Sequence, residues 1–203
     1  MKNKNILVTG GTGLIGSFLV EKLVKGNNVK CLVLKNTDIK VLDNLDVEIV
    51  YGNLSNIVSL KNAVKDVDIV FNLAAAFKKD LPKDASEEYY FKVNVDGTEN
   101  LLRVCLENEI QKVIHLSACG VYGHNSDMPI NEESPYRPTN SYERSKCEGE
   151  KVALRYNNLG LQYMHKGDLK KAKELFEKAL KISPTFKDAL TNLEHVKQYL
   201  GEK

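Results

Sequence analysis

Short apolar runs and segments of helical spacing alternate along the first 120 residues of the chain. Residues 5–9 form a short, partly β-branched apolar run, and a glycine cluster follows. Apolar positions then recur at helical spacing, at Leu14, Phe18, Leu19, Leu23 and Val24. Further elements are predicted as strands at 29–34, 47–51, 69–73 and 112–117, and as helices around 57–64 and 93–108. This alternation predicts an α/β fold, a doubly wound parallel sheet of about five strands with helices on both faces.

The pattern changes towards the end of the chain. Residues 153–203 carry no strand signal and are predicted to form helices interrupted near Gly167 and near Ser183-Pro184. We therefore divide the chain into residues 1–152 and residues 153–203. The junction leaves an alternative open, since residues 152–164 also fit the end of one helix followed by a strand, but the repeat pattern described next favours a helix there.

Aromatic and small residues of the second part resemble one tetratricopeptide repeat. The matched residues are Tyr156, Leu159, Gly160, Tyr163, Ala172, Phe176, Ala179 and Pro184. A third amphipathic helix is expected as a cap, with Leu190, Leu193, Val196 and Leu200 on one face. A generic helical hairpin is the alternative. Because one repeat and a cap do not bury a continuous core, this segment is expected to pack near the fifth strand, or to associate with a second copy or a protein partner.

The composition is ordinary for a globular protein, with 42% hydrophobic and 28% charged residues among 203. A formal net charge of +2 gives no basic field that would favour nucleic acid or anionic lipid. No apolar run is long enough for a membrane span or a signal peptide. The cysteines show no metal-ligand spacing. We therefore expect a cytoplasmic protein with reduced thiols, no metal site, and no nucleic-acid or membrane partner.

The segment from Thr9 to Gly16 reads TGGTGLIG, between a predicted strand and a predicted helix. Glycine lets the backbone approach a diphosphate closely, and the N–H groups at a helix start favour an anion. In this context the motif predicts a Rossmann-type domain that binds NAD or NADP through Gly10, Gly11, Thr12, Gly13, Leu14, Ile15 and Gly16. A plain glycine turn is the alternative.

The choice between the two nucleotides depends on the end of the second strand. The acidic residue that would bind the ribose 2′-hydroxyl of NAD is missing there, and Lys35 and Asn36 take its place. A lysine can bind the 2′-phosphate of NADP, so Lys35 slightly favours NADP. The alternative is a solvated lysine at a strand end.

Tyr142 and Lys146 form a YxxxK pair on one face of a helix expected from Thr139 to Lys151, with Ser141 as its N-cap. A nearby ammonium lowers the pKa of a phenol, so the tyrosine is expected to exchange a proton near neutral pH. Taken alone, the pair also fits two surface residues.

Several segments, in order, give the chain a resemblance to a known family. They are Thr9–Gly16, Tyr51–Leu54, Val67–Ala75, Asn94–Thr98, His115–Gly123, and Tyr142 with Lys146. In these segments the chain resembles the extended short-chain dehydrogenase/reductase family, which includes NAD-dependent epimerases and dehydratases of nucleotide sugars.

The resemblance implies a role for individual residues. Tyr142 would be the acid/base, and Lys146 would also bind the nicotinamide ribose. Asn53 and Leu54 would lie by the adenine, and Asn94 would steady the interior next to the site. The residues near the ribose and the diphosphate would be Leu73, Ala74 and Ala75.

Three features depart from the family pattern. Ala118 stands where the family usually has a serine or threonine, and the neighbouring hydroxyl, Ser117, is expected to point to the opposite face of the strand. Losing one donor to the reacting oxygen is expected to reduce turnover by roughly 10²-fold or more while nucleotide binding persists. Asn53 replaces an aspartate and can still accept from the adenine amine. Family members also continue into a substrate lobe, so the family part is expected to be truncated.

These features predict an NAD(P)-binding protein of the epimerase/dehydratase type. Its expected chemistry is hydride exchange with a sugar-like alcohol, such as a nucleotide sugar, with Tyr142, Lys146 and Ser117 as the catalytic candidates. The alternative is a non-catalytic module in which the repeat binds a partner and the nucleotide fold is a scaffold or redox sensor.

Overall fold

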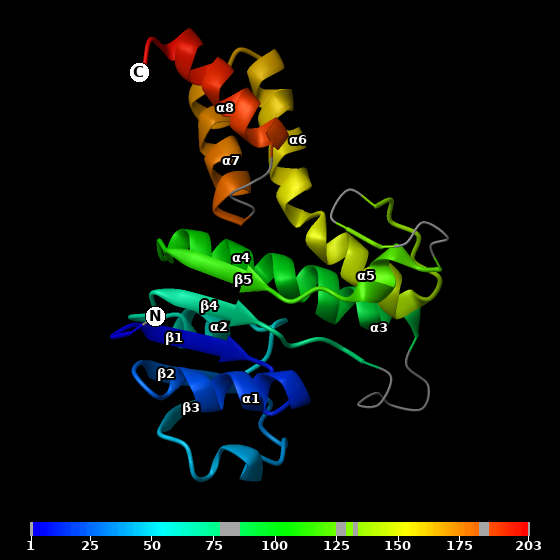
Figure 1. The fold of residues 1–203 in the computed structure, drawn as a ribbon. Coiled ribbons are helices and arrows are strands. Elements are labelled where there is room, and N and C mark those ends of the chain that lie inside the picture. Colours follow the sequence, from blue (N-terminus) through cyan, green and yellow to red (C-terminus); the bar gives the residue numbers. More distant parts are fainter. Residues whose placement is uncertain (1, 78–85, 125–128, 132–133, 183–186, 203) are drawn as a thin grey trace. The chain divides into compact units, whose positions relative to one another are not determined.

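A computed structural model of the protein describes most of the chain, in residues 2–77, 86–124, 129–131, 134–182 and 187–202 (Figure 1). The chain divides into two compact units, Met1–Gly149 and Glu150–Lys203. Within the described ranges, no helix is both long enough and apolar enough to cross a membrane.

The first unit is built on a parallel sheet of five strands in the order β3-β2-β1-β4-β5. The strands are β1 (Asn5–Thr9), β2 (Asn28–Val33), β3 (Val47–Tyr51), β4 (Ile69–Asn72) and β5 (Lys112–His115). Figure 1 shows β1 between β2 and β4, so the strand order reverses at β1. Ligands of doubly wound sheets bind at such a reversal, beyond the carboxyl ends of the strands. The predicted α/β class and strand number are confirmed.

Helices cover both faces of this sheet. α1 (Leu14–Leu23) covers one face, and α2 (Ile57–Ala63) and α4 (Gly97–Glu107) cover the other. The chain also contains α3 (Glu87–Phe91) and α5 (Ser141–Glu150). Leu7 of β1 belongs to one buried cluster with Leu60 of α2 and Leu101 of α4, whereas Val8 belongs to another with Val20 of α1. Because neighbouring residues of a strand point to opposite faces, the two clusters fill the two sides of the sheet.

The helix predicted at 93–108 is divided in the structure. A π-helical turn, Lys92–Asp96, joins α3 to α4. Gly97 follows this turn, and a Cβ there would lie 2.7 Å from the Cβ of Leu54. The missing side chain therefore lets the start of α4 pack closely against the segment that follows β3.

The strands predicted at 69–73 and 112–117 are shorter than expected. They end at Asn72 and His115. The backbone pairing between β4 and β5 continues only to the bond from Leu116 N to Asn72 O, at 3.0 Å. The Leu116 carbonyl then accepts from Lys146 Nζ at 2.6 Å instead of from another strand. The Lys146 ammonium group therefore replaces the hydrogen bonds between strands at the point where β5 ends.

The second unit contains the helices α6 (Val152–His165), α7 (Leu169–Ile182) and α8 (Lys187–Leu200). The residues at the junction are helical, as the repeat pattern favoured. Gly167 has φ +80° and follows the end of α6, which confirms the predicted interruption there. The second predicted interruption, at Ser183-Pro184, lies outside the described residues.

The core of the second unit forms around Phe176. Phe176, Ala172 and Val196 are fully buried in one cluster. Gly160 faces the ring, because a Cβ there would lie 2.6 Å from Phe176 Cε1. A small residue on α6 therefore makes room for the aromatic ring of α7, as the sequence predicts for a helical repeat.

Candidate functional site

The glycine loop joins β1 to α1 through close backbone contacts. Gly10 has φ +71°, and a Cβ there would lie 2.7 Å from Ala74 N. A Cβ at Gly16 would collide with the Gly10 carbonyl oxygen. Gly13 N donates to Gly10 O at 3.0 Å, which closes the turn. Both Gly10 and Gly16 are therefore required by the loop itself, before any ligand is considered.

The amino end of α1 is open to solvent and carries no negative side chain. Gly13 is its N-cap in an extended conformation, without a side-chain cap, and the first turn holds no acidic residue. Leu14 and Ile15 are 79% and 58% exposed. The unpaired N–H groups and positive dipole end of a helix attract an anion. The cradle has room for a diphosphate, since a Cβ at Gly13 would meet only Gly10 O within 4 Å, at 3.3 Å.

A buried hydrogen-bond chain connects this loop to β4. Ala74 N donates to Thr9 Oγ1 at 3.1 Å, and Thr9 Oγ1 donates to Asn72 Oδ1 at 2.7 Å. Asn72 Nδ2 lies 3.0 Å from His115 Nδ1 and 3.4 Å from Thr98 Oγ1. The loop, the end of β4 and the end of β5 are thus tied together by side chains.

Lys146 of α5 reaches the carboxyl end of β5. Its side chain is 3% exposed, and Nζ lies 2.6 Å from Leu116 O and 3.5 Å from His115 Nε2. Burial lowers the pKa of His115 to about 3, and the adjacent Lys146 ammonium contributes to the shift. The imidazole is therefore neutral at physiological pH, while the lysine is positioned at the same edge of the sheet as the glycine loop.

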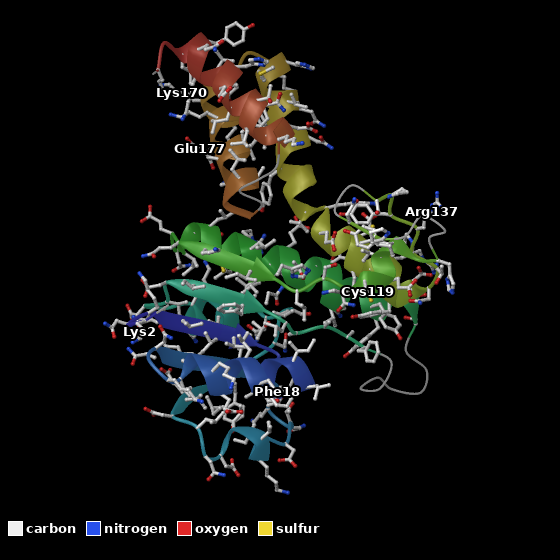
Figure 2. All side chains as sticks on the ribbon, in the orientation of Figure 1. Lys2, Phe18, Cys119, Arg137, Lys170 and Glu177 are labelled. Carbon is white, nitrogen blue, oxygen red and sulfur yellow. The ribbon has the colours of Figure 1, made fainter. Side chains whose placement is uncertain are left out.

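Tyr142 lies one helical turn before Lys146 and is half-buried among aromatic rings. The ring centroids of Phe77 and Tyr90 lie 5.0 and 6.4 Å from that of Tyr142. Burial raises the pKa of the Tyr142 phenol, and Cys119, which is seen beside α5 in Figure 2, raises it further. The expectation that Lys146 lowers this pKa is wrong for this structure, because desolvation dominates and the lysine donates to a backbone carbonyl.

Asn94 of the π-helical turn is buried and connects three segments. Its Oδ1 accepts from Ala76 N at 2.7 Å, and its Nδ2 donates to Ala76 O at 3.2 Å and to Ser145 Oγ at 2.9 Å. Ser145 Oγ in turn donates to Tyr142 O at 2.7 Å. The segment after β4 and the helix that carries the tyrosine are therefore held by one amide.

The start of α5 is fixed by a cap other than the predicted one. The helix begins at Ser141, and Asn140 Oδ1 accepts from Glu143 N at 2.9 Å, so Asn140 and not Ser141 caps it. Glu143 reaches back to Thr139, with Oε2 at 2.7 Å from both N and Oγ1. The arrangement differs from a capping box in that the carboxylate accepts from Thr139, one residue before the N-cap, and these hydrogen bonds lower the pKa of Glu143.

The remaining predicted residues lie around this edge with different exposure. Lys35 is exposed beyond the end of β2, and Ser117 is half-buried next to Ala118. Leu54 is buried, whereas Asn53 is exposed. Asn53 Oδ1 accepts from Ser55 N at 2.9 Å, so its oxygen already serves a local turn. Thr12 is half-buried in the glycine loop, and Leu73, Ala74 and Ala75 are half-buried after β4.

Several residues of the site were missed by sequence reasoning. Asn72, Thr98, His115 and Ser145 carry the interior hydrogen bonds described above. Each of them is a polar residue within or beside a predicted apolar element. Such a residue indicates a site only once its hydrogen-bond partner is known, so the sequence pattern alone did not single these residues out. Among the described residues, no group of three or more His, Cys, Asp or Glu side chains could hold a metal ion. Cys31, Cys105 and Cys147 are buried and Cys119 is exposed, and none of these four is in a disulfide.

Comparisons with known proteins agree on one family. The family described as "NAD dependent epimerase/dehydratase family" matches residues 6–165, and the tetratricopeptide repeat matches residues 153–186. Sterol demethylase protein B of Methylococcus capsulatus is 34% identical over 148 residues, which are 71% of this chain and 44% of that protein. A putative UDP-glucose 4-epimerase of Methanocaldococcus jannaschii is 33% identical over 165 residues, 78% of this chain and 53% of that protein.

A solved structure gives the same result. The Bordetella bronchiseptica enzyme WbmG in complex with NAD and UDP superposes with a TM-score of 0.65 at 26% identity, over 73% of this chain and 48% of that chain. The chain spans about half the length of the curated relatives it matches. The family match covers most of the sequence, and the sheet order, glycine loop and YxxxK helix lie within it. The chain therefore belongs to the NAD dependent epimerase/dehydratase family, and its C-terminal part matches a tetratricopeptide repeat.

Proposed function

We propose that the first unit binds NAD beyond the carboxyl ends of β1 and β4, with the diphosphate at the start of α1. The observation that carries the proposal is the glycine loop, which is folded into an open helix start free of acidic side chains in its first turn. NAD in the related WbmG structure favours this nucleotide. NADP, which Lys35 favours, is the second choice, and a side-by-side titration separates the two.

In this proposal Lys146 and Tyr142 form the reacting edge of the site. NAD supplies the hydride acceptor when it is bound. Lys146 would donate to the nicotinamide ribose from its place at the end of β5. Tyr142 would hold the proton that is exchanged with the substrate oxygen. Because burial raises its pKa, the phenol is protonated at neutral pH, so Tyr142 would have to lose its own proton before it could take the hydroxyl proton of the substrate as the hydride leaves.

The substrate class that we propose is an alcohol of a nucleotide sugar. UDP in the WbmG complex and the name of the archaeal relative support this class. Ala118 offers no hydroxyl to the reacting oxygen, and Ser117 is the neighbouring candidate. Turnover is therefore expected to be slow relative to nucleotide binding.

A second candidate function follows from the same observations. The raised pKa of Tyr142 and the alanine at position 118 both favour binding over turnover. Together with the tetratricopeptide match, they support a nucleotide-binding module whose helical unit binds a protein or a second copy of the chain. In that case the nucleotide would be retained without chemistry.

One experiment separates these functions. NADH and NADPH are titrated into the full chain, which has no tryptophan, so that changes in nucleotide fluorescence report binding directly. Hydride exchange is then assayed with a panel of nucleotide sugars. Binding with turnover that is lost in Tyr142→Phe supports the enzyme, and equal turnover in Tyr142→Phe contradicts the proposed role. Binding without turnover supports the module. Absence of binding at millimolar nucleotide contradicts both.

A further inference from the structure

Phe77, in the segment after β4, packs directly against the tyrosine of the site. The two rings meet edge to face, with centroids 5.0 Å apart and ring planes at 76° to each other, which is a preferred arrangement of aromatic side chains. Phe77 is 50% exposed and belongs to neither buried cluster of the sheet, although phenylalanine is usually a core residue. Its packing therefore serves the surroundings of Tyr142 more than the apolar core.

The backbone on both sides of this ring contact is fixed by the buried amide of Asn94. The amide binds both backbone groups of Ala76, at 2.7 and 3.2 Å, and Ala76 immediately precedes Phe77. The same amide donates to Ser145 Oγ, which donates to the Tyr142 carbonyl. One buried residue thus sets the separation between the segment that carries Phe77 and the helix that carries Tyr142. The ring contact is therefore built into the fold.

A second ring, that of Tyr90 on α3, also packs against Tyr142. The centroids lie 6.4 Å apart, with the planes at 63°. The ion pair between Glu87 and Arg144, at 2.9 Å, holds α3 on α5. No described residue forms a hydrogen bond with the Tyr142 hydroxyl. The orientation of the phenol therefore depends on the packing of these rings.

The titratable groups around the phenol come from α3, from α5 and from the 3₁₀ turn that follows β5. On α5, Glu143 is bound to the start of the helix, and Lys146 donates to a backbone carbonyl. On α3, Glu87 is paired with an arginine. Cys119 of the 3₁₀ turn is the one group among these that raises the pKa of the phenol, and burial raises it more strongly. The side chains that cover the ring therefore matter more than the charges near it.

We propose that Phe77 is a positioning residue for Tyr142. Its ring holds the tyrosine ring beyond the carboxyl end of β4 and keeps water from one side of the phenol. A phenol that is held and shielded in this way keeps its proton, which it can donate to a substrate oxygen. The inference rests on the role proposed for Tyr142. It predicts that Phe77 controls the protonation of the tyrosine and not the affinity for the dinucleotide, because the diphosphate is assigned to the glycine loop.

The substitution Phe77→Ala tests this role on the full chain without nucleotide. Carbon-13 NMR of tyrosine labelled at Cζ follows the ionisation of each phenol, and the signal that is absent from Tyr142→Phe identifies Tyr142. We expect Phe77→Ala to lower the pH at which Tyr142 ionises, because water then reaches the phenol. Phe77→Leu keeps an apolar side chain at this position and should shift the midpoint less. An unchanged midpoint in Phe77→Ala would overturn the proposal.

Two further variants separate the ring contact from other causes. Phe18→Ala is the matched control, because Phe18 is 62% exposed on α1 and makes no ring contact with Tyr142, so the midpoint should stay unchanged. Cys119→Ser removes the weaker cause of the raised pKa and should shift the midpoint less than Phe77→Ala. A larger shift in Cys119→Ser would show that charge determines the protonation, which contradicts the inference. Circular dichroism establishes the pH range over which each variant is folded.

The affinity for NADH separates this inference from the proposed function. Phe77→Ala should bind NADH as tightly as the wild type, and a tenfold loss would show that the ring contacts the nucleotide, against a role through Tyr142. If Phe77→Ala does not fold, nuclear Overhauser contacts between the two rings in the unaltered protein decide the matter, and their absence would overturn the proposal. Failure of the wild type to bind NADH contradicts the proposed function instead, whereas the NMR titration still tests Phe77.

Discussion

The buried amide of Asn94 lies 2.9 Å from the hydroxyl of Ser145, which is one turn away from the tyrosine that the site depends on. The Ser145 hydroxyl in turn donates a hydrogen bond to the Tyr142 carbonyl oxygen at 2.7 Å. The π-helical turn makes the contact possible, because it lies between α3 and α4 and carries Asn94 into the interior. The position of α5 is thus fixed by a polar contact in addition to apolar packing.

This relationship predicts the effect of Ser145→Ala. The substitution leaves one hydrogen of a buried amide without its acceptor, so the free energy of unfolding should fall by about 1–3 kcal/mol. Urea unfolding followed by circular dichroism measures the change. Ser55→Ala, at an exposed position, is the control and should lie within about 0.5 kcal/mol of the wild type. Equal stability of Ser145→Ala and the control would show that the contact is not structural.

The glycine loop offers a pair of substitutions with different outcomes. Gly16→Ala places a Cβ against the Gly10 carbonyl, so we expect loss of the folded loop and a large drop in melting temperature. At Gly13 the nearest atom to a Cβ is Gly10 O at 3.3 Å and the backbone is extended, so Gly13→Ala should fold. Its methyl group would take up space beside the helix start, where we propose that the diphosphate binds, so NADH binding should weaken. Thermal unfolding and NADH titration measure the two effects, and normal NADH affinity in Gly13→Ala would count against the site.

The buried imidazole predicts a dependence of stability on pH. The pKa of His115 is about 3 in the folded protein and about 6.5 in an unfolded chain, so the unfolded state binds more protons between these values. The contribution of the neutral ring to the free energy of unfolding is fully present above pH 6.5. It falls by at most about 1.4 kcal/mol per pH unit as the pH drops towards 3. Urea unfolding of the wild type and His115→Asn at several pH values checks this. The variant should show the shallower slope, and identical slopes would disprove the prediction.

In the second unit, Gly160 and Phe176 give a packing prediction. Alanine is a better helix former than glycine, but a Cβ at position 160 would lie 2.6 Å from a fully buried ring. The overpacking should outweigh the helix propensity, and Gly160→Ala should lower the stability of the helical unit by about 1–3 kcal/mol. Helical circular dichroism during heating of the full chain reports the change. Asn158→Ala, on the exposed side of α6, should be neutral or stabilising.

Local patterns were sufficient for most of the fold. The bounds of β1 and β3 agree with the strands predicted at residues 5–9 and 47–51. For β1 the reason is that a buried parallel strand is a short, nearly continuous apolar segment. β3 lies at the edge of the sheet and is partly exposed, and its β-branched residues were the signal. The glycine loop was recognisable because its conformation depends on residues that are adjacent in sequence. The spacing of Gly160 and Phe176 likewise predicted the helical pair of the second unit.

Other features depended on partners far away in the sequence. The pattern placed Tyr142 and Lys146 on one helix face, but only the tertiary structure showed that burial raises the pKa of the phenol and that the lysine bonds to Leu116 O. The cap of α5 was misassigned by one residue, since serine and asparagine have similar preferences and only geometry separates them. The roles of His115 and Asn72 could not be read from the sequence, because a buried polar residue acquires its function from the groups that surround it after folding. The sequence by itself therefore determined the sheet, the loop and the family, whereas the tertiary structure decided protonation, positioning and the buried hydrogen-bond chain, which depend on distances between residues that are remote along the chain.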